Sequence, residues 1–167
     1  GRLAASLDVD FGLSEEGMVI LLDGNYITGR LRSEEVSAMA SETAALPGVR
    51  VALVQRQRAF RRPPGLVADG RDMGTVIFPD AVLKIFLTAS ARARAERRYK
   101  QLKEKGESVY LSRLFRDIEK RDARDSQRAV SPLRPASDSH VIDSTEMDIE
   151  EVLQKILSLI EESELTL

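Results

Sequence analysis

A short apolar run, Leu83-Lys84-Ile85-Phe86-Leu87, decides the fold class of this chain. Its length and bounding turn residues are typical of a buried strand, and a charged helical segment begins soon after it, at Ser90. Two further runs are expected to be strands, residues 66–69 and 140–143, and a helix is expected over residues 109–128. Strands that alternate with helices predict an α/β protein with a parallel sheet flanked by helices.

The amino-terminal third of the sequence has a different pattern. Apolar and polar positions alternate within residues 1–32, and turn signals at Ser14–Gly17 and Asp23–Asn25 predict a small antiparallel β-meander. Two helices are expected next, from Ser33 to about Leu46 and over residues 49–61, with Pro47-Gly48 as the break between them.

The sequence therefore predicts two domains. Residues 1–63 form an insert of antiparallel β-structure and helices, and residues 64–167 form the core. The core is expected to end in an amphipathic helix over Asp148–Glu162. Only three strands of the parallel sheet are visible in the sequence, so we expect that sheet to be incomplete here.

Composition excludes several classes of site. The chain has 167 residues, of which 43% are hydrophobic and 31% charged, with no cysteine and one histidine. A disulfide scaffold, a thiolate metal site and a multi-histidine metal site are therefore excluded, and no metal site is expected. No apolar run approaches the roughly 20 residues that cross a bilayer. We expect a cytoplasmic protein without a membrane partner, in which His140 is structural.

Charge is distributed very unevenly along the chain. The formal charge is −5 over residues 1–49, +11 over residues 50–134 and −8 over residues 135–167. Arginine provides most of the positive charge, and its planar fork binds phosphate through two parallel hydrogen bonds. The basic middle is thus a candidate site for a phosphorylated ligand, although solvated helices or an arginine-rich proteome would give the same excess. Long basic tails are absent, which disfavours a nucleic-acid partner.

One candidate site is the loop Gly70-Arg71-Asp72-Met73-Gly74-Thr75, which follows an expected strand. Open α/β sheets bind ligands at the carboxyl ends of their strands. Arg71 is suited to a phosphate, and Asp72 is suited to an exocyclic amine such as N4 of cytosine. The alternative is an ordinary turn in which the Arg and the Asp pair with each other.

A second candidate site is the helical segment that contains Arg121, Arg124, Asp125 and Arg128. At 100° per residue these four side chains fall within an arc of roughly 100°. A surface ladder of i,i+4 and i,i+3 ion pairs is the alternative. Three guanidinium groups against one carboxylate leave an excess of positive charge, which suits an anion better than a balanced ladder does.

A third candidate is the basic helix that begins at Ser90. It carries four arginines and is followed by a glycine hinge at Gly106, so it is expected to form part of a lid over a polyphosphate, at about residues 93–108. The four arginines are Arg92, Arg94, Arg97 and Arg98.

Taken in order, these segments resemble the bacterial cytidylate kinases, within the nucleoside monophosphate kinase group. The resemblance covers nearly all of the chain. It is carried by Ser33–Val36, Arg56–Phe60, Ala68–Val76, Phe78–Asp80, Lys84–Leu87, Arg121–Asp122 through Ala129–Val130, Pro132–Leu133 and Asp143–Thr145. It implies a P-loop NTPase-like fold with a five-stranded parallel sheet, an insert for the nucleoside monophosphate and a short lid. It also implies ATP-dependent phosphorylation of CMP or dCMP in pyrimidine nucleotide metabolism, with Mg²⁺.

The resemblance assigns roles to individual residues. Arg71 would bind the CMP phosphate, and Arg121 and Asp125 would contact the sugar and the adjoining phosphate. Arg97 or Arg98 would reach ATP from the lid. The residues implied at the cytosine end are Ser41, Arg50 and Asp72, with Arg128 nearby. The catalytic set implied is Arg71, Arg121 and Arg97.

The chain also departs from the family. It contains no G-x-x-x-x-G-K-[S/T] motif, whose backbone amides, lysine and hydroxyl bind ATP phosphates and Mg²⁺. We therefore expect these 167 residues to be the carboxyl-terminal portion of a longer, monomeric enzyme, and to transfer no phosphate alone. Two alternatives remain open: a catalytically inactive CMP-binding or regulatory module, and a nucleic-acid-binding domain.

Overall fold

Two separate units make up the fold of this chain. A computed structural model describes residues 1–15, 17–43, 46–127 and 132–163. The first unit is Gly1–Val67 and the second is Ala68–Leu167.

The first unit contains the expected β-meander. Strands β1 (Val9–Ser14), β2 (Gly17–Leu22) and β3 (Asn25–Tyr26) form an antiparallel sheet in the order β1-β2-β3. Asp23 and Gly24 connect β2 to β3 with φ angles of 50° and 72°. A two-residue turn with two positive φ angles matches the twist of paired strands and favours Asp-Gly. The turn signal in the sequence is thus confirmed.

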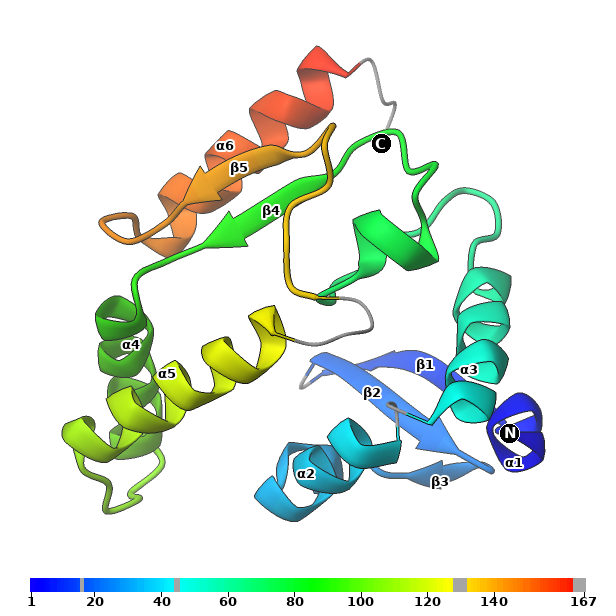
Figure 1. The fold of residues 1–167 in the computed structure, drawn as a ribbon, viewed down its shortest axis with the longest axis horizontal. Helices are drawn as coiled ribbons and strands as arrows, with labels where there is room; N and C mark the ends of the chain where they lie inside the picture. The colour runs from blue at the N-terminus through cyan, green and yellow to red at the C-terminus, as the bar shows by residue number, and fades with distance from the viewer. Residues whose placement is uncertain (16, 44–45, 128–131, 164–167) are drawn as a thin grey trace. The chain divides into compact units, whose positions relative to one another are not determined.

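Three helices of the first unit lie beside this sheet (Figure 1). After the short α1 (Arg2–Ser6), a 3₁₀ turn, η1 (Arg30–Arg32), leads into α2 (Glu34–Thr43), and α3 (Pro47–Ala59) follows. Helix α3 begins two residues earlier than predicted. The predicted break at Pro47 is the first residue of a helix because proline lacks an N–H, and the first residue of a helix needs none.

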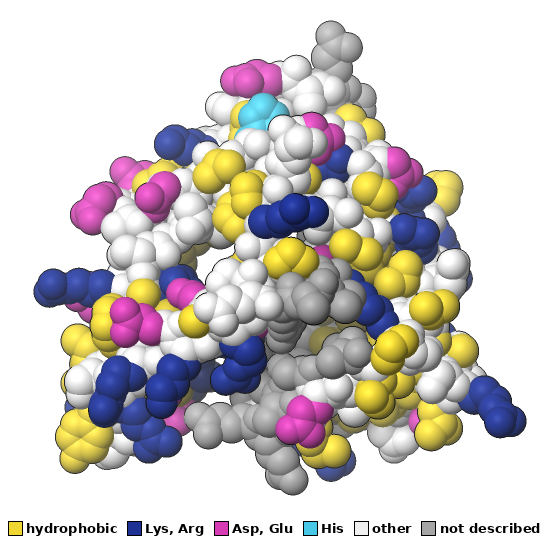
Figure 2. Space-filling model, viewed as in Figure 1, with side chains coloured by type: hydrophobic (Ala, Val, Ile, Leu, Met, Phe, Trp, Pro, Cys, Tyr) yellow, Lys and Arg dark blue, Asp and Glu magenta, His cyan; other side chains and the backbone are white. Residues whose placement is uncertain are grey.

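An aromatic contact joins β1 to the residue that ends α3. The rings of Phe11 and Phe60 meet edge to face with their centroids 5.2 Å apart. The guanidinium carbon of Arg56 lies 5.8 Å from the Phe60 ring centroid, within range of a cation–π interaction. Hydrophobic side chains are nonetheless visible at the surface of both units (Figure 2).

The second unit contains the predicted parallel sheet. Strands β4 (Ile85–Thr88) and β5 (His140–Asp143) pair in parallel from Ile85 with His140 to Thr88 with Asp143. Helix α6 (Ile149–Glu162) lies beside β5 (Figure 1). His140 opens β5 as expected, and its side chain is exposed.

The strand expected at residues 66–69 was a wrong prediction. The stretch has no regular secondary structure, and the side chain of Val67 is 98% exposed. No strand pairs with it in the part of the chain that the structure describes, so its backbone groups have no ladder partners. The loop after it coils into a π-type turn, η2 (Met73–Ile77).

Three helices of the second unit match the expected segments. Helix α4 (Ala91–Glu104) begins at Ser90, whose hydroxyl accepts a hydrogen bond from the Ala93 N–H at 3.2 Å. Helix α5 (Leu111–Ser126) packs against α4. Helix α6 has a capping box in which Asp148 and Glu151 each accept a hydrogen bond from the other's backbone N–H.

Buried side chains in the second unit mark its core. The apolar ones are Ile77, Phe78, Ala95, Leu102 and Ile142. They come from the turn η2 and the residue after it, from α4 and from β5, so the loop after Gly70 is anchored in the core. In the described residues, no helix is both long enough and apolar enough to span a bilayer.

Candidate functional site

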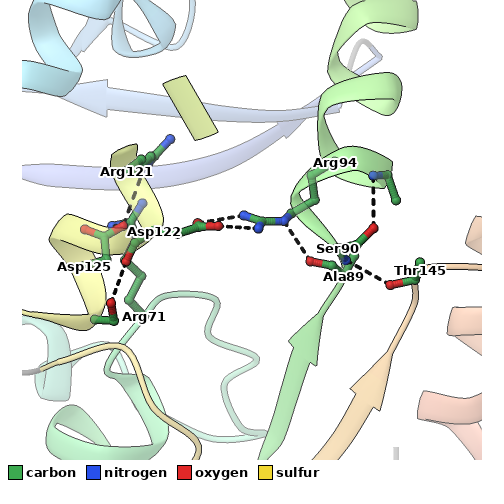
Figure 3. Close-up of polar contacts among 10 residues, drawn as sticks. Arg71, Ala89, Ser90, Arg94, Arg121, Asp122, Asp125 and Thr145 are labelled. Carbon is green, nitrogen blue, oxygen red and sulfur yellow. Dashed lines mark hydrogen bonds and ion pairs between the residues drawn. The ribbon is translucent and has the colours of Figure 1, made fainter. Parts of the chain in front are cut away.

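The last two turns of α5 face two arginines from other segments of the second unit (Figure 3). Asp125, on α5, forms an ion pair with Arg71, from the loop before η2. Asp125 is 2% exposed, while the Arg71 side chain is 33% exposed. Arg121, one turn earlier, has its Nε 4.0 Å from Asp125 Oδ2. A buried carboxylate thus lies between two guanidinium groups that both reach solvent.

The turn η2 determines where Arg71 projects. The Asp72 carbonyl accepts hydrogen bonds from the N–H groups of Val76 and Ile77, at 2.9 and 3.2 Å. A Cβ at Gly70 would lie 2.9 Å from the terminal carbon of the Met73 side chain, so that side chain packs directly over the glycine. Two backbone hydrogen bonds and a side-chain contact therefore define the turn that directly follows Arg71.

A buried lysine, Lys84, contacts the same turn. The Lys84 Nζ donates to the Pro79 carbonyl at 2.6 Å and to Asp138 Oδ2 at 2.5 Å. The aliphatic carbons of Lys84 lie close to Gly74, where a Cβ would be 3.4 Å away. The hydrogen bond from Lys84 lowers the pKa of Asp138, which favours the ionised carboxylate. Lys84 therefore stabilises η2 and the segment before β5 together.

A second ion pair joins α5 to α4. Arg94 donates from Nη1 to Asp122 Oδ1 at 2.8 Å and from Nη2 to Asp122 Oδ2 at 2.5 Å. Its Nε donates to the Ala89 carbonyl at 3.0 Å. The hydrogen bond from Arg94 lowers the pKa of Asp122, and attraction to Arg71 and Arg121 lowers it further. The same hydrogen bond raises the pKa of Arg94, so both groups are charged at neutral pH.

A fourth arginine binds the loop after β5. Arg97, on α4, donates to the Ser144 hydroxyl at 3.2 Å, to the Ser144 carbonyl, and to the Met147 carbonyl at 3.0 Å. Thr145 Oγ1 accepts from the Ser90 N–H at 2.9 Å. These bonds tie the carboxyl ends of both parallel strands to the start of α4. Arg98, the next residue on α4, is exposed.

Of the residues singled out in the sequence, the structure brings Arg71, Arg121 and Asp125 together. Asp72 is adjacent to Arg71 and is half-buried. Arg50 lies on α3 and Ser41 on α2, both in the first unit, and the Ser41 side chain is outside the described part of the structure. Arg128 is also outside the described residues.

Sequence reasoning missed the residues that support this cluster. Arg94 was named only as one of four arginines of the expected lid, and Asp122 and Lys84 only as part of the family resemblance. A lysine inside a strand signal was the one hint that a buried partner existed. Asp138, the partner, lies far away in the sequence and carries no local signal.

The geometry suits an anionic ligand. The guanidinium groups of Arg71 and Arg121 approach one buried carboxylate and retain solvent-exposed surface, so a phosphate can approach them from the solvent side. Thr75 Oγ1 is buried without a hydrogen-bond partner in the described structure, next to the same loop. Among the described residues no group of three acidic or histidine side chains forms, so they do not build a metal site.

Comparisons with known proteins agree with each other. The family model described as cytidylate kinase matches residues 2–162. The chain is 60% identical over 165 residues to "Cytidylate kinase" of Stutzerimonas stutzeri (strain A1501), which covers 98% of this chain and 72% of the relative. It is 63% identical over 158 residues to "Cytidylate kinase" of Pseudomonas fluorescens (strain Pf-5), which covers 93% of this chain and 69% of the relative.

Proposed function

Because the chain belongs to the cytidylate kinase family, we propose that it binds CMP or dCMP for phosphorylation by ATP. The observation that carries the proposal is the buried carboxylate of Asp125 between Arg71 and Arg121. In this arrangement the guanidinium groups bind the phosphate of CMP, and Asp125 orients them. A ribose hydroxyl reaches Asp125 only once Arg71 or Arg121 shifts, because the carboxylate side chain is 3% exposed. The bacterial cytoplasm is the compartment that we propose.

The reaction requires positioning and neutralisation of charge. An oxygen of the CMP phosphate attacks the γ-phosphorus of ATP, a new P–O bond forms, and the bond to the β-phosphate oxygen breaks, which gives CDP and ADP. The attacking oxygen is already anionic, so no general base is needed. Arg71 and Arg121 reduce the repulsion between the two phosphates and align the attacking oxygen.

The base is recognised separately from the phosphate. Asp72 follows Arg71 directly, so a nucleotide whose phosphate binds Arg71 can present its base to the same loop. We propose that Asp72 accepts a hydrogen bond from the cytosine N4 amine, which uracil lacks. The other residues proposed at the cytosine end are Ser41, Arg50 and Arg128.

On the ATP side, Arg98 is the better of the two proposed arginines. Both side chains are exposed, but the guanidinium of Arg97 already donates three hydrogen bonds to residues 144–147. We propose that α4, within a lid of residues 93–108, presents Arg98 to the phosphates of ATP. Among the described residues no group of three acidic or histidine side chains is placed to hold a metal ion, so Mg²⁺ would be held mainly by the phosphates of ATP.

The architecture proposed for the whole is that of a P-loop NTPase. A parallel sheet flanked by helices forms the core, residues 64–167, and the β-meander with its helices forms the insert for the monophosphate, residues 1–63. The parallel pair β4–β5 and the antiparallel sheet β1-β2-β3 support this division.

Calorimetric titration of the chain with CMP, UMP and cytidine tests the proposal. We expect CMP to bind more tightly than UMP, and cytidine to bind weakly because it lacks the phosphate. Arg71→Gln should weaken CMP by about a hundredfold, the usual cost of a charge-assisted bidentate contact. Arg113→Gln on α5 is the matched control, because its partner Asp117 is exposed. Equal binding of CMP and cytidine would contradict the proposal.

A catalytically inactive CMP-binding module is the second candidate. These 167 residues contain no G-x-x-x-x-G-K-[S/T] loop, so their sequence does not by itself distinguish this module from the kinase. CMP binding does not distinguish the two functions, whereas phosphate transfer does.

A further inference from the structure

Neighbouring residues of α5 face two different arginines. Arg121 and Asp125 lie with Arg71, whereas Asp122 faces Arg94 of α4 (Figure 3). Asp122 is therefore a carboxylate next to Arg71 and Arg121, which are proposed to bind phosphate. It forms its own ion pair with Arg94.

All three guanidinium nitrogens of Arg94 donate hydrogen bonds. Both terminal nitrogens of Arg94 bind the two carboxylate oxygens, at 2.8 and 2.5 Å. The third nitrogen, Nε, donates to the Ala89 carbonyl at 3.0 Å, where the chain leaves β4 and enters α4. The guanidinium plane is thus fixed at both ends, and a bidentate pair of this kind is more strongly oriented than a lysine contact would be.

Asp122 lies within the electrostatic reach of the proposed phosphate site. Arg71 and Arg121 both contribute to lowering the pKa of the Asp122 carboxyl, after the larger contribution of Arg94. The attraction acts in both directions: without Arg94, a negative Asp122 would compete with a phosphate for Arg71 and Arg121. Electrostatic competition of this kind weakens an anion more than a neutral ligand.

We propose that Arg94 is a positioning residue that acts through Asp122. It fixes and neutralises this carboxylate, so that Arg71 and Arg121 stay available for the phosphate of the nucleotide. The inference rests on the proposed function, because it concerns the same phosphate. Arg94 therefore connects the carboxyl end of β4 to the nucleotide-binding face of α5 without contacting the nucleotide.

Titration of the chain with CMP and with cytidine tests the inference. Arg94→Gln should weaken CMP roughly tenfold, because one unpaired charge then acts on the phosphate, and should leave cytidine unchanged. Asp122→Asn should bind CMP at least as tightly as the unaltered chain. The double variant Arg94→Gln/Asp122→Asn should recover the CMP affinity that Arg94→Gln loses. A merely structural contact would lower affinity for both ligands and would not be rescued.

Two controls separate the possible outcomes. Arg113→Gln removes an exposed arginine from α5 and should leave CMP affinity unchanged. If Arg94→Gln behaves like this control, or if the double variant shows no recovery, the inference is wrong while the proposed function stands. If CMP binds no better than cytidine to the unaltered chain, both are wrong. Should Arg94→Gln fail to fold, the Asp122→Asn variant alone decides: weaker CMP binding overturns the inference.

Discussion

Arg71 and Asp125 form an ion pair whose two members differ in their access to water. The carboxylate side chain is 3% exposed and the guanidinium side chain is 33% exposed. Asp125 therefore depends on its protein partners, while Arg71 keeps a surface that a ligand can reach. Loss of the carboxylate and loss of the guanidinium should consequently have different effects on stability and binding.

Asp125→Ala should lower the free energy of unfolding by about 2–3 kcal/mol, because a buried ion pair is costly to break from one side. This decrease in the free energy of unfolding is smaller than for a fully buried pair, because the Arg71 side chain can be solvated after its partner is lost. Chemical denaturation at neutral pH measures it. Asp117→Ala on the same helix, whose side chain is 58% exposed, should cost less than about 0.5 kcal/mol. If both variants lost the same free energy of unfolding, the buried ion pair of Asp125 would not stabilise the fold.

Asp72→Asn should change base preference. The amide keeps the size of the carboxyl but offers a donor as well as an acceptor, so it no longer favours the cytosine amine. CMP binding is expected to weaken by about tenfold and UMP binding by less, as measured by calorimetry of both nucleotides with each protein. If both nucleotides lose the same factor, Asp72 does not read the base.

Acid should destabilise the fold partly through Asp122. The hydrogen bond from Arg94 lowers the pKa of Asp122 below its ordinary value of 3.8. Since the unfolded chain then takes up this proton first, the stabilisation is present above that value and is lost as the pH falls through the folded-state pKa. Denaturation midpoints measured from pH 6 down to about pH 2.5 should fall less steeply for Asp122→Asn.

The matched control for this pH series is Asp117→Asn, which removes an exposed carboxylate from the same helix, α5. Asp138 and Asp143 also have lowered pKa values, from hydrogen bonds with Lys84 and Thr145, and they contribute to the remaining slope in every variant. An identical slope for Asp122→Asn and the unaltered chain would contradict the role of Arg94 in ionising Asp122.

Arg97→Gln should loosen the loop after β5. The variant loses hydrogen bonds to Ser144 and Met147, so amide hydrogens of residues 144–147 should exchange roughly tenfold faster. Arg98→Gln, at the next position of α4, is the control and should leave this exchange unchanged. Faster exchange in the control alone would show that the assignment of the two arginines is reversed.

Phosphate transfer by these 167 residues alone is expected to be at the detection limit. The sequence has no G-x-x-x-x-G-K-[S/T] loop to bind the phosphates of ATP, although the residues proposed for CMP are present. A coupled assay with ATP, CMP and Mg²⁺ measures it. Robust turnover would show that another part of the chain binds the triphosphate.

Local signals in the sequence determined the elements well. The Asp23-Gly24 turn and the starts of the helices at Ser90 and Asp148 lie where the sequence predicts them. In the structure a Ser90 cap and an Asp148 capping box mark these two starts, and each depends on residues within four positions. The alternation of strand and helix from β4 to α6 followed from the same short-range patterns. Spacing on a helix also placed Arg121 and Asp125 on one face.

Tertiary structure decided which charges meet. The sequence could not show that Asp122 turns to Arg94, that Lys84 is buried against Asp138, or that Arg97 holds the loop after β5. These partners lie far apart in the sequence, and their pairing depends on how α4, α5 and the parallel strands pack. The strand expected at residues 66–69 failed for the same reason: an apolar run becomes a strand only where a neighbouring strand offers hydrogen bonds.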